Sequence, residues 1–295
     1  MKRCSGAAEV LRYRLDTKAT TERHWAGAAM NTENPYQSPT ANVVTDTQLT
    51  VKQPRRVAMG RGSNWIAAGW RYFAANPGPW IGAAVVWLLI SSVGSLIPVV
   101  SIAINVITPV FMGGLIAGCV DQDDGRPFRF DHLFSGFRDQ FGPLAVLGLI
   151  QLGLFIGLVL ALGIVVAGVL FAAGYADIFD NPNLIYDSGA LLAVLLVTLI
   201  GLLVAMPIVM AMWFAPALVV HGKKAPVEAL LLSFRGCMKN VMPFLPYGLL
   251  LLLLGVFGVA TAFLGAMVVM PITVASIYVG YKDIFLYDQG VLGHD

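Results

Sequence analysis

The chain has 295 residues, of which 57% are apolar and only 12% charged, and its mean hydropathy is +0.75. Such a composition excludes an ordinary soluble globular protein and is typical of a chain that lies largely within a lipid bilayer. The net charge of +2 gives no reason to expect a nucleic-acid partner.

Four long stretches carry no charged side chain, and they set the number of membrane crossings. They cover residues 72–120, 140–176, 188–220 and 240–281. Because a helix needs about 20 residues to cross a hydrocarbon core of roughly 30 Å, the outer two stretches hold two crossings each and the middle two hold one each. The sequence therefore predicts an all-α polytopic membrane protein with six transmembrane helices, near residues 80–97, 99–120, 143–172, 190–220, 246–264 and 266–284.

Three shorter amphipathic segments precede the entering helices and are expected to lie along the membrane surface. In the clearest, residues 130–143, apolar side chains fall at i, i+3, i+4, i+7 and i+11, and Asp131 can cap the helix. Ser63 is a plausible cap for the first segment, and Pro226 suits the first turn of the third. Each segment contains an aromatic–arginine pair, and we predict headgroup contacts at Trp70, Arg71, Phe137, Arg138, Phe234 and Arg235.

The three segments suggest a threefold internal repeat of amphipathic helix, entering helix and returning helix. The alternative is that aromatic belts and a positive inner face generate such pairs by themselves. All Lys and Arg residues in the predicted connections lie in those on one side of the membrane, so we expect both termini to be cytoplasmic.

Residues 1–62 are predicted to form a disordered cytoplasmic tail, residues 63–287 the six-helix membrane domain, and residues 288–295 a short cytoplasmic tail. Met30 opens MNTENPYQSPTA, which reads like a natural protein start, so residues 1–29 are expected to be an untranslated extension. NPYQSP resembles a motif that opens many unrelated bacterial membrane proteins. Three arginines before residue 63 suit anionic headgroups: Arg55, Arg56 and Arg61.

Two of the predicted crossings are irregular. The third is about 30 residues long, so it must tilt, break at a glycine or project outward, and it carries a stripe of glycines for packing against a neighbour. The fourth contains Pro207 and Pro216, which predict a kink or a partly unwound inner half. The loop at residues 121–128 fails the EF-hand spacing, and a turn at Asp124–Gly125 explains it better.

Catalytic patterns are missing from the sequence. Its three cysteines and four histidines show no metal-ligand spacing, and the spans hold no acid or base, so we expect no metal, no cofactor and no enzymatic activity. Asn105 and Gln151 are the candidate interior polar residues.

Three segments carry a family resemblance: GSNWIAAGWRYFAANPGPWIG, SLIPVVSIAINVITPVFMGGLIAG and FRFDHLFSGFRDQFGPL. Over about residues 60–285 the chain resembles an uncharacterised family of six-pass bacterial inner-membrane proteins. It is more remotely similar to the membrane domain of some glycerophosphodiester phosphodiesterases. The resemblance implies a location and a fold, and no activity, because the catalytic domain of those phosphodiesterases has no counterpart in this sequence.

Two functions remain open on this evidence. The first is a non-enzymatic inner-membrane protein that organises membrane lipids, or a protein partner bound through the cytoplasmic tail. The second is a transporter or channel for a neutral or amphipathic solute. A continuous polar cavity reaching the membrane midplane favours the second function, and tightly packed glycine contacts without one favour the first.

Overall fold

The computed structural model describes residues 51–172, 174, 188–261 and 264–286. The chain divides into two compact units, Met1–Gln48 and Leu49–Asp295, and every described residue belongs to the second. The predictions for the tail up to residue 50, with its start at Met30, for most of the loop between the third and fourth crossings and for residues 288–295 concern residues outside that description.

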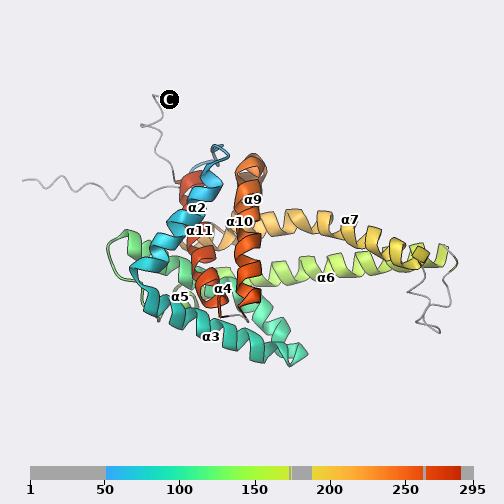
Figure 1. The fold of residues 1–295 in the computed structure, drawn as a ribbon, viewed down its shortest axis with the longest axis horizontal. Coiled ribbons are helices and arrows are strands. Elements are labelled where there is room, and N and C mark those ends of the chain that lie inside the picture. Colours follow the sequence, from blue (N-terminus) through green and yellow to red (C-terminus); the bar gives the residue numbers. More distant parts are fainter. Residues whose placement is uncertain (1–50, 173, 175–187, 262–263, 287–295) are drawn as a thin grey trace, which may run out of the picture. The chain divides into compact units, whose positions relative to one another are not determined.

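Every regular element in the described ranges is an α-helix, and six spans are long and apolar enough to cross a membrane, which confirms the predicted fold class. The spans are α3, α4, α6, the α7–α8 pair, α10 and α11. In chain order the helices (Figure 1) are α2 (Arg61–Ala75), α3 (Pro77–Ser95), α4 (Pro98–Asp123), α5 (His132–Asp139), α6 (Phe141–Ala172), α7 (Ser188–Trp213), α8 (Ala215–Val220), α9 (Pro226–Lys239), α10 (Val241–Ala260) and α11 (Ala266–Phe285).

The elements come in three sets of the same order, a short amphipathic helix followed by two spans. The short helices are α2, α5 and α9. Helix α5 packs against α4 and α9 packs against α7, so each meets the second span of the set before it, while α2 packs against α11. The three sets are therefore linked in a closed ring of contacts, in which each short helix joins its own set to the preceding one, and α2 joins the first set to the third.

A small residue two positions before the arginine of each aromatic–arginine pair lies at these crossings. A Cβ added to Gly69 would lie 2.6 Å from the Ile272 carbonyl oxygen, and one added to Gly136 would lie 2.1 Å from that of Val110. The third set has Ser233 instead, and its hydroxyl donates to a carbonyl oxygen of α7 at 2.7 Å. The helix backbones can approach this closely only because the side chains are small.

The two predicted side-chain caps do not form. Ser63 lies inside the first turn of α2, where its hydroxyl donates to the Gly60 carbonyl at 2.9 Å. Asp131 precedes α5 but pairs with Arg129 at 3.3 Å. Both residues at the cap position, Gly60 and Asp131, have helical backbone angles, whereas a side chain reaches the free N–H groups from an extended residue.

The fourth crossing breaks at Phe214, between α7 and α8, as its prolines predicted. Pro216 lies in the first turn of α8 and has no N–H to continue the helix. The Ser233 hydroxyl accepts the Phe214 N–H at 3.0 Å and donates to the Met210 carbonyl, so it occupies the place of the helical bond between those residues. Insertion of a side chain into the helical bonding is a recognised cause of a kink.

The third crossing, α6, is one continuous helix of 32 residues, about 48 Å long at 1.5 Å per residue. Its predicted glycine stripe does not face a neighbour in the described part of the chain, where a Cβ at Gly153, Gly157, Gly163 or Gly168 would have nothing within 4 Å. Helix α6 contacts α7 through larger side chains instead, as where Leu162 covers Gly201.

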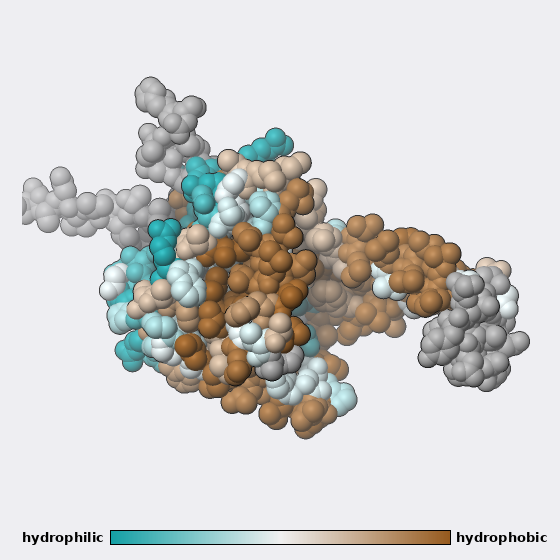
Figure 2. All heavy atoms as spheres, viewed as in Figure 1, coloured by the Kyte–Doolittle hydropathy of each residue, from teal (hydrophilic) through white to brown (hydrophobic). Residues whose placement is uncertain are grey.

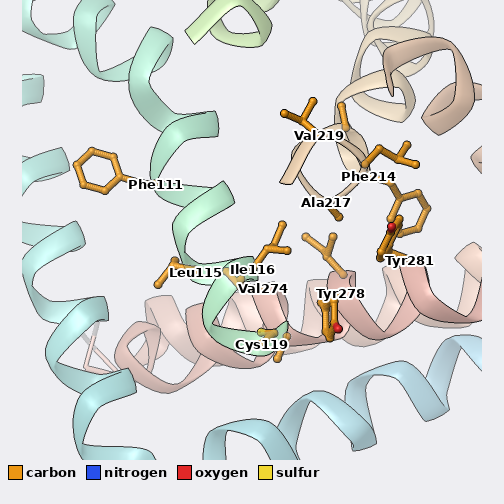
Figure 3. Packing of buried hydrophobic residues seen from close by; sticks show 14 of the residues in the cluster. Phe111, Leu115, Ile116, Cys119, Phe214, Ala217, Val219, Val274, Tyr278 and Tyr281 are labelled. Atoms are coloured by element: carbon orange, nitrogen blue, oxygen red, sulfur yellow. The ribbon is translucent and has the colours of Figure 1, made fainter. Parts of the chain in front are cut away.

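The main core lies where α4, α8 and α11 meet. Figure 3 shows Leu115, Ile116 and Cys119 of α4 near Val274 and Tyr278 of α11, with side chains of α8 beyond them. All five of these side chains are buried. Hydrophilic residues gather instead over α2 and the turn after α4, whereas hydrophobic ones cover α6, α7 and the visible side of α10 (Figure 2).

Candidate functional site

A cavity of about 400 Å³, which we call the central crevice, lies between α3, α4, α10 and α11. Apolar side chains such as Trp87, Leu115 and Met270 line most of it. Thr108 and Thr273 also line it, but their hydroxyls donate to carbonyl oxygens of their own helices, at 2.7 and 2.8 Å. With both hydroxyls engaged, the lining suits hydrocarbon better than a polar solute.

A second cavity, of about 220 Å³, lies on another side of α4, and we call it the Gln151 cavity. Gln151 lines it, as expected of an interior polar residue. The half-buried Trp213 also lines it, and its buried indole N–H has no acceptor among the described residues. Asn105 was predicted as interior too, but its side chain is exposed and its amide donates to the Ser101 carbonyl at 2.9 Å. A polar side chain satisfied by its own helix has no need of an interior partner.

The predicted headgroup contacts divide into exposed and packed side chains. Trp70 is 51% exposed, and the three arginines of the pairs are exposed as well. Phe137 and Phe234 are half-buried, and Phe137 packs against the main core. The exposed arginines can therefore reach headgroups, with Arg138 also 4.0 Å from the Asp131 carboxylate, while Phe137 attaches α5 to the fold.

A network of polar side chains joins α2, α4 and α11 where α4 ends. Asp123 accepts hydrogen bonds from Tyr72 and from Tyr278, the latter at 2.8 Å, and pairs with Lys282. The Lys282 ammonium also donates to the Tyr72 hydroxyl at 2.8 Å. Burial, together with the bond to Asp123, raises the pKa of Tyr72 well above its ordinary value, so this hydroxyl stays protonated and acts as a donor.

A second cluster surrounds Asp283, in the last turn of α11. Its carboxylate accepts hydrogen bonds from Arg55 at 2.8 Å, from Arg61 at 2.8 and 2.9 Å, and from the Trp65 indole at 2.9 Å. The hydrogen bond to Asp283 raises the pKa of Arg61. Residues 55–61 were predicted to belong to the disordered tail and to offer arginines to lipid, but two of those arginines instead fix this segment to α11.

The backbone completes this attachment. The Lys52 N–H donates to the Phe285 carbonyl at 3.0 Å and the Arg55 N–H to that of Ile284 at 3.1 Å. Carbonyl groups in the last turn of a helix have no partner within it, so the segment satisfies two that would otherwise need water.

A polar pocket of about 290 Å³ lies at the ends of α4, α5 and α8. Asp121, Asp139, His221 and Lys223 line it together with small apolar residues. Burial and the nearby Lys223 ammonium lower the pKa of His221, which favours the neutral ring. The Nδ1 atom of that ring lies 3.1 Å from the Tyr281 hydroxyl.

The groups most able to act as bases or nucleophiles are held in structural contacts. His132 was interpreted as a headgroup-level residue, but it is buried beside Phe128, with its Nε2 2.9 Å from the Asp121 carboxylate. Burial raises the pKa of the Cys237 thiol to about 12, and that thiol donates to the Met210 carbonyl. A protonated, buried thiol is a poor nucleophile.

Neither polar cluster was predicted from the sequence, although the sequence contains a signal for both. Charged residues directly follow the second predicted span, as DQDD, and occupy the last turn of the sixth, as YKD. Charges at that depth need partners, and the arginines and tyrosine near the first amphipathic segment were available to supply them.

Comparison with known proteins agrees with a membrane location. The chain is 29% identical over 257 residues to a protein described as a probable inner membrane protein in Burkholderia thailandensis, and the match covers 80% of this chain and 93% of that relative. No protein-family model matches the chain, and no solved structure does. The similarity to the membrane domain of phosphodiesterases remains an expectation. This relative and the six apolar helices together support a multi-pass inner-membrane protein.

Proposed function

We propose that this chain is a non-enzymatic inner-membrane protein that organises membrane lipids. The observation that carries the proposal is the central crevice, an apolar cavity between spans in which both threonine hydroxyls are already bonded. Close glycine contacts, expected for this function, occur at Gly69, Gly136 and Gly148. A protein partner bound through the tail remains compatible with it.

The orientation is part of the proposal. Both termini lie in the cytoplasm, because the connections after α4 and α8 carry Lys and Arg residues such as Arg126, Arg129, Lys223 and Lys224. Single cysteines introduced at Gly125 and at Gly174 test this with a membrane-impermeant thiol reagent on intact cells. Labelling at Gly174 alone supports the orientation, and labelling at Gly125 alone reverses it.

The test of the function is the lipid and protein content of the chain purified from native membranes after mild crosslinking. A lipid class enriched several-fold over the bulk membrane, or a specific partner, is the expected result. Recovery of bulk lipid alone, in membrane proportions, contradicts the proposal.

The second candidate is a transporter of an amphipathic solute, and the Gln151 cavity favours it. This cavity combines Gln151 with the unpartnered Trp213 N–H beside the break between α7 and α8, and broken helices line the sites of many transporters. Uptake into proteoliposomes that Gln151→Leu abolishes would support transport. Equal uptake by that variant and the wild type would remove this candidate.

A further inference from the structure

The polar pocket has one free charge of each sign. Lys223 and Asp139 both line it, and neither forms an ion pair with another described residue. The other two ionisable groups are engaged, because Asp121 pairs with Arg126 and His132, and His221 lies against Tyr281. A ligand that carries an anion and a cation can therefore meet a partner for each.

The backbone at Lys223 strengthens this assignment. Its φ is +51°, the left-handed region that a lysine seldom adopts, although Gly222 directly precedes it. The turn is closed by the Lys224 N–H, which donates to the Leu218 carbonyl at 3.0 Å. A glycine at position 223 would adopt this turn without strain, and strained residues concentrate at binding sites.

The polar pocket and the Gln151 cavity follow one another along the same helices. On α4, Gly113 lines the polar pocket and Met112 the Gln151 cavity, and on α8, Val220 lines the first and Pro216 the second. Two side chains with N–H donors line the deeper cavity, Gln151 and Trp213, and the Trp213 N–H has no partner among the described residues. The order of charged, hydrogen-bonding and apolar groups matches the headgroup, ester carbonyls and acyl chains of a phospholipid.

We propose that the polar pocket and the Gln151 cavity together bind one zwitterionic phospholipid with a primary ammonium headgroup, of the phosphoethanolamine class. The Lys223 ammonium binds the phosphate, and the Asp139 carboxylate accepts hydrogen bonds from the lipid ammonium. Trp213 and Gln151 donate to an ester carbonyl. This assignment rests on the proposed lipid-organising function and names the lipid.

The charges in the pocket argue against an anionic lipid. A headgroup with phosphate alone would satisfy Lys223 but leave the Asp139 carboxylate unpaired beside an anion. A choline headgroup carries the cation but has no N–H to donate, so it cannot form the hydrogen bond that the carboxylate accepts. The pocket is therefore expected to rank ethanolamine above choline and glycerol headgroups.

The experiment measures lipid binding to the full chain in nanodiscs that contain equal amounts of ethanolamine, choline and glycerol phospholipids with the same acyl chains. Bound lipids are identified by native mass spectrometry. Lys223→Gly and Asp139→Asn each remove one charge, and the first fits the existing backbone without strain. Lys224→Gln and Asp131→Asn are matched controls, because they make the same charge changes outside the pocket, the first next in sequence to Lys223 and the second at the opposite end of α5 from Asp139.

The wild type and both controls are expected to enrich the ethanolamine lipid. In each pocket variant this enrichment is expected to fall about fivefold, which corresponds to the loss of one partly exposed ion pair. Equal enrichment in all variants, or equal loss in the controls, overturns the proposed pocket while leaving a lipid-organising function intact. Absence of any enriched lipid in the wild type contradicts the proposed function itself. Free phosphoethanolamine at millimolar concentration is expected not to displace the lipid, and displacement would assign the pocket to the soluble headgroup.

Discussion

Helices α6 and α11 are both membrane spans, but they are built in opposite ways. Helix α6 has the higher mean hydropathy, 2.9 against 1.3 for α11, yet only 6% of its most apolar 18 residues are buried within the fold, compared with 67% for α11. Of the six spans, α6 is thus the least buried although none has a higher mean hydropathy, and α11, which carries Ser276, Lys282 and Asp283, is the most buried.

This contrast follows from the solvent. Lipid tails are as apolar as leucine, so an apolar surface gains little by leaving lipid for the protein interior, whereas small and hydrogen-bonding residues gain close packing and partners. Helix α11 makes such contacts with two helices: the Tyr247 hydroxyl of α10 lies 2.8 Å from that of Ser276, and Gly69 of α2 approaches the Ile272 carbonyl. In this chain, helices with small and hydrogen-bonding side chains are therefore the buried ones, and high hydropathy indicates a helix that faces lipid.

The largest effect is expected from Asp283→Ala. The substitution removes the carboxylate that accepts from Arg55, Arg61 and the buried Trp65 N–H, while the bond from Arg55 to the Asp283 carbonyl is kept. It should lower the free energy of unfolding by about 3 kcal/mol, less than for a fully buried pair because Arg61 is half exposed. Thermal unfolding in detergent measures this loss. Asp124→Ala, which removes an exposed ion pair with Arg126, is the control and should change stability little. Equal effects of the two would show that α11 is not held by this cluster.

A smaller loss is expected from Gly136→Ala. Its Cβ would lie 2.1 Å from a backbone oxygen of α4, so α5 must shift away at a cost of about 2 kcal/mol. Gly153→Ala on α6 makes the same change where nothing lies within 4 Å. Unfolding midpoints of the two variants should differ clearly, and equal midpoints would argue against the close crossing of α5 and α4.

A modest dependence of stability on pH is expected from His221. Burial lowers its folded-state pKa below 6.5, so the unfolded chain takes up its proton first as pH falls. The stability that the neutral ring contributes is therefore complete above about pH 6.5 and is lost as pH falls toward the lowered pKa. Unfolding measured from pH 8 to 5 should show a smaller loss for His221→Gln than for the wild type, and identical profiles would contradict the assignment.

The smallest effect is expected from Gly157→Leu on α6. With nothing in the described part of the chain within 4 Å of the added Cβ, stability should change by less than about 0.5 kcal/mol. Thermal unfolding in dilute detergent is the measurement, with Gly148→Leu as the contrasting change, because its Cβ would lie 1.8 Å from the Val106 carbonyl. A large loss at Gly157 would indicate that this face packs against another helix after all.

The spans were predictable from the sequence because each is a long uncharged run, and bilayer thickness leaves little choice in how such a run folds. Pro216 allowed the break at Phe214 to be predicted. The part played by Ser233 was not predictable, because Ser233 lies 19 residues from Phe214 in the sequence. The glycine stripe of α6 was misread for a related reason. A glycine pattern permits close packing but does not say whether a partner helix is present.

The site was less predictable than the fold. Of the two candidate interior polar residues, Gln151 lines a cavity, whereas Asn105 is exposed and its amide is satisfied by its own helix. Arg55 and Arg61 were assigned to lipid because their partner, Asp283, lies more than 200 residues away in the sequence. Pairings over such separations depend on tertiary structure, and no local pattern records them.

The contrast between α6 and α11 can be measured directly with phospholipids that carry a photoreactive group in the acyl chain. After photolysis in native-composition nanodiscs, labelled peptides are located by mass spectrometry. The account predicts dense labelling along α6, including the exposed Leu160 and Ile164, and no labelling of the buried residues 274–278 of α11. Labelling of that part of α11 at the level seen on α6 would contradict it.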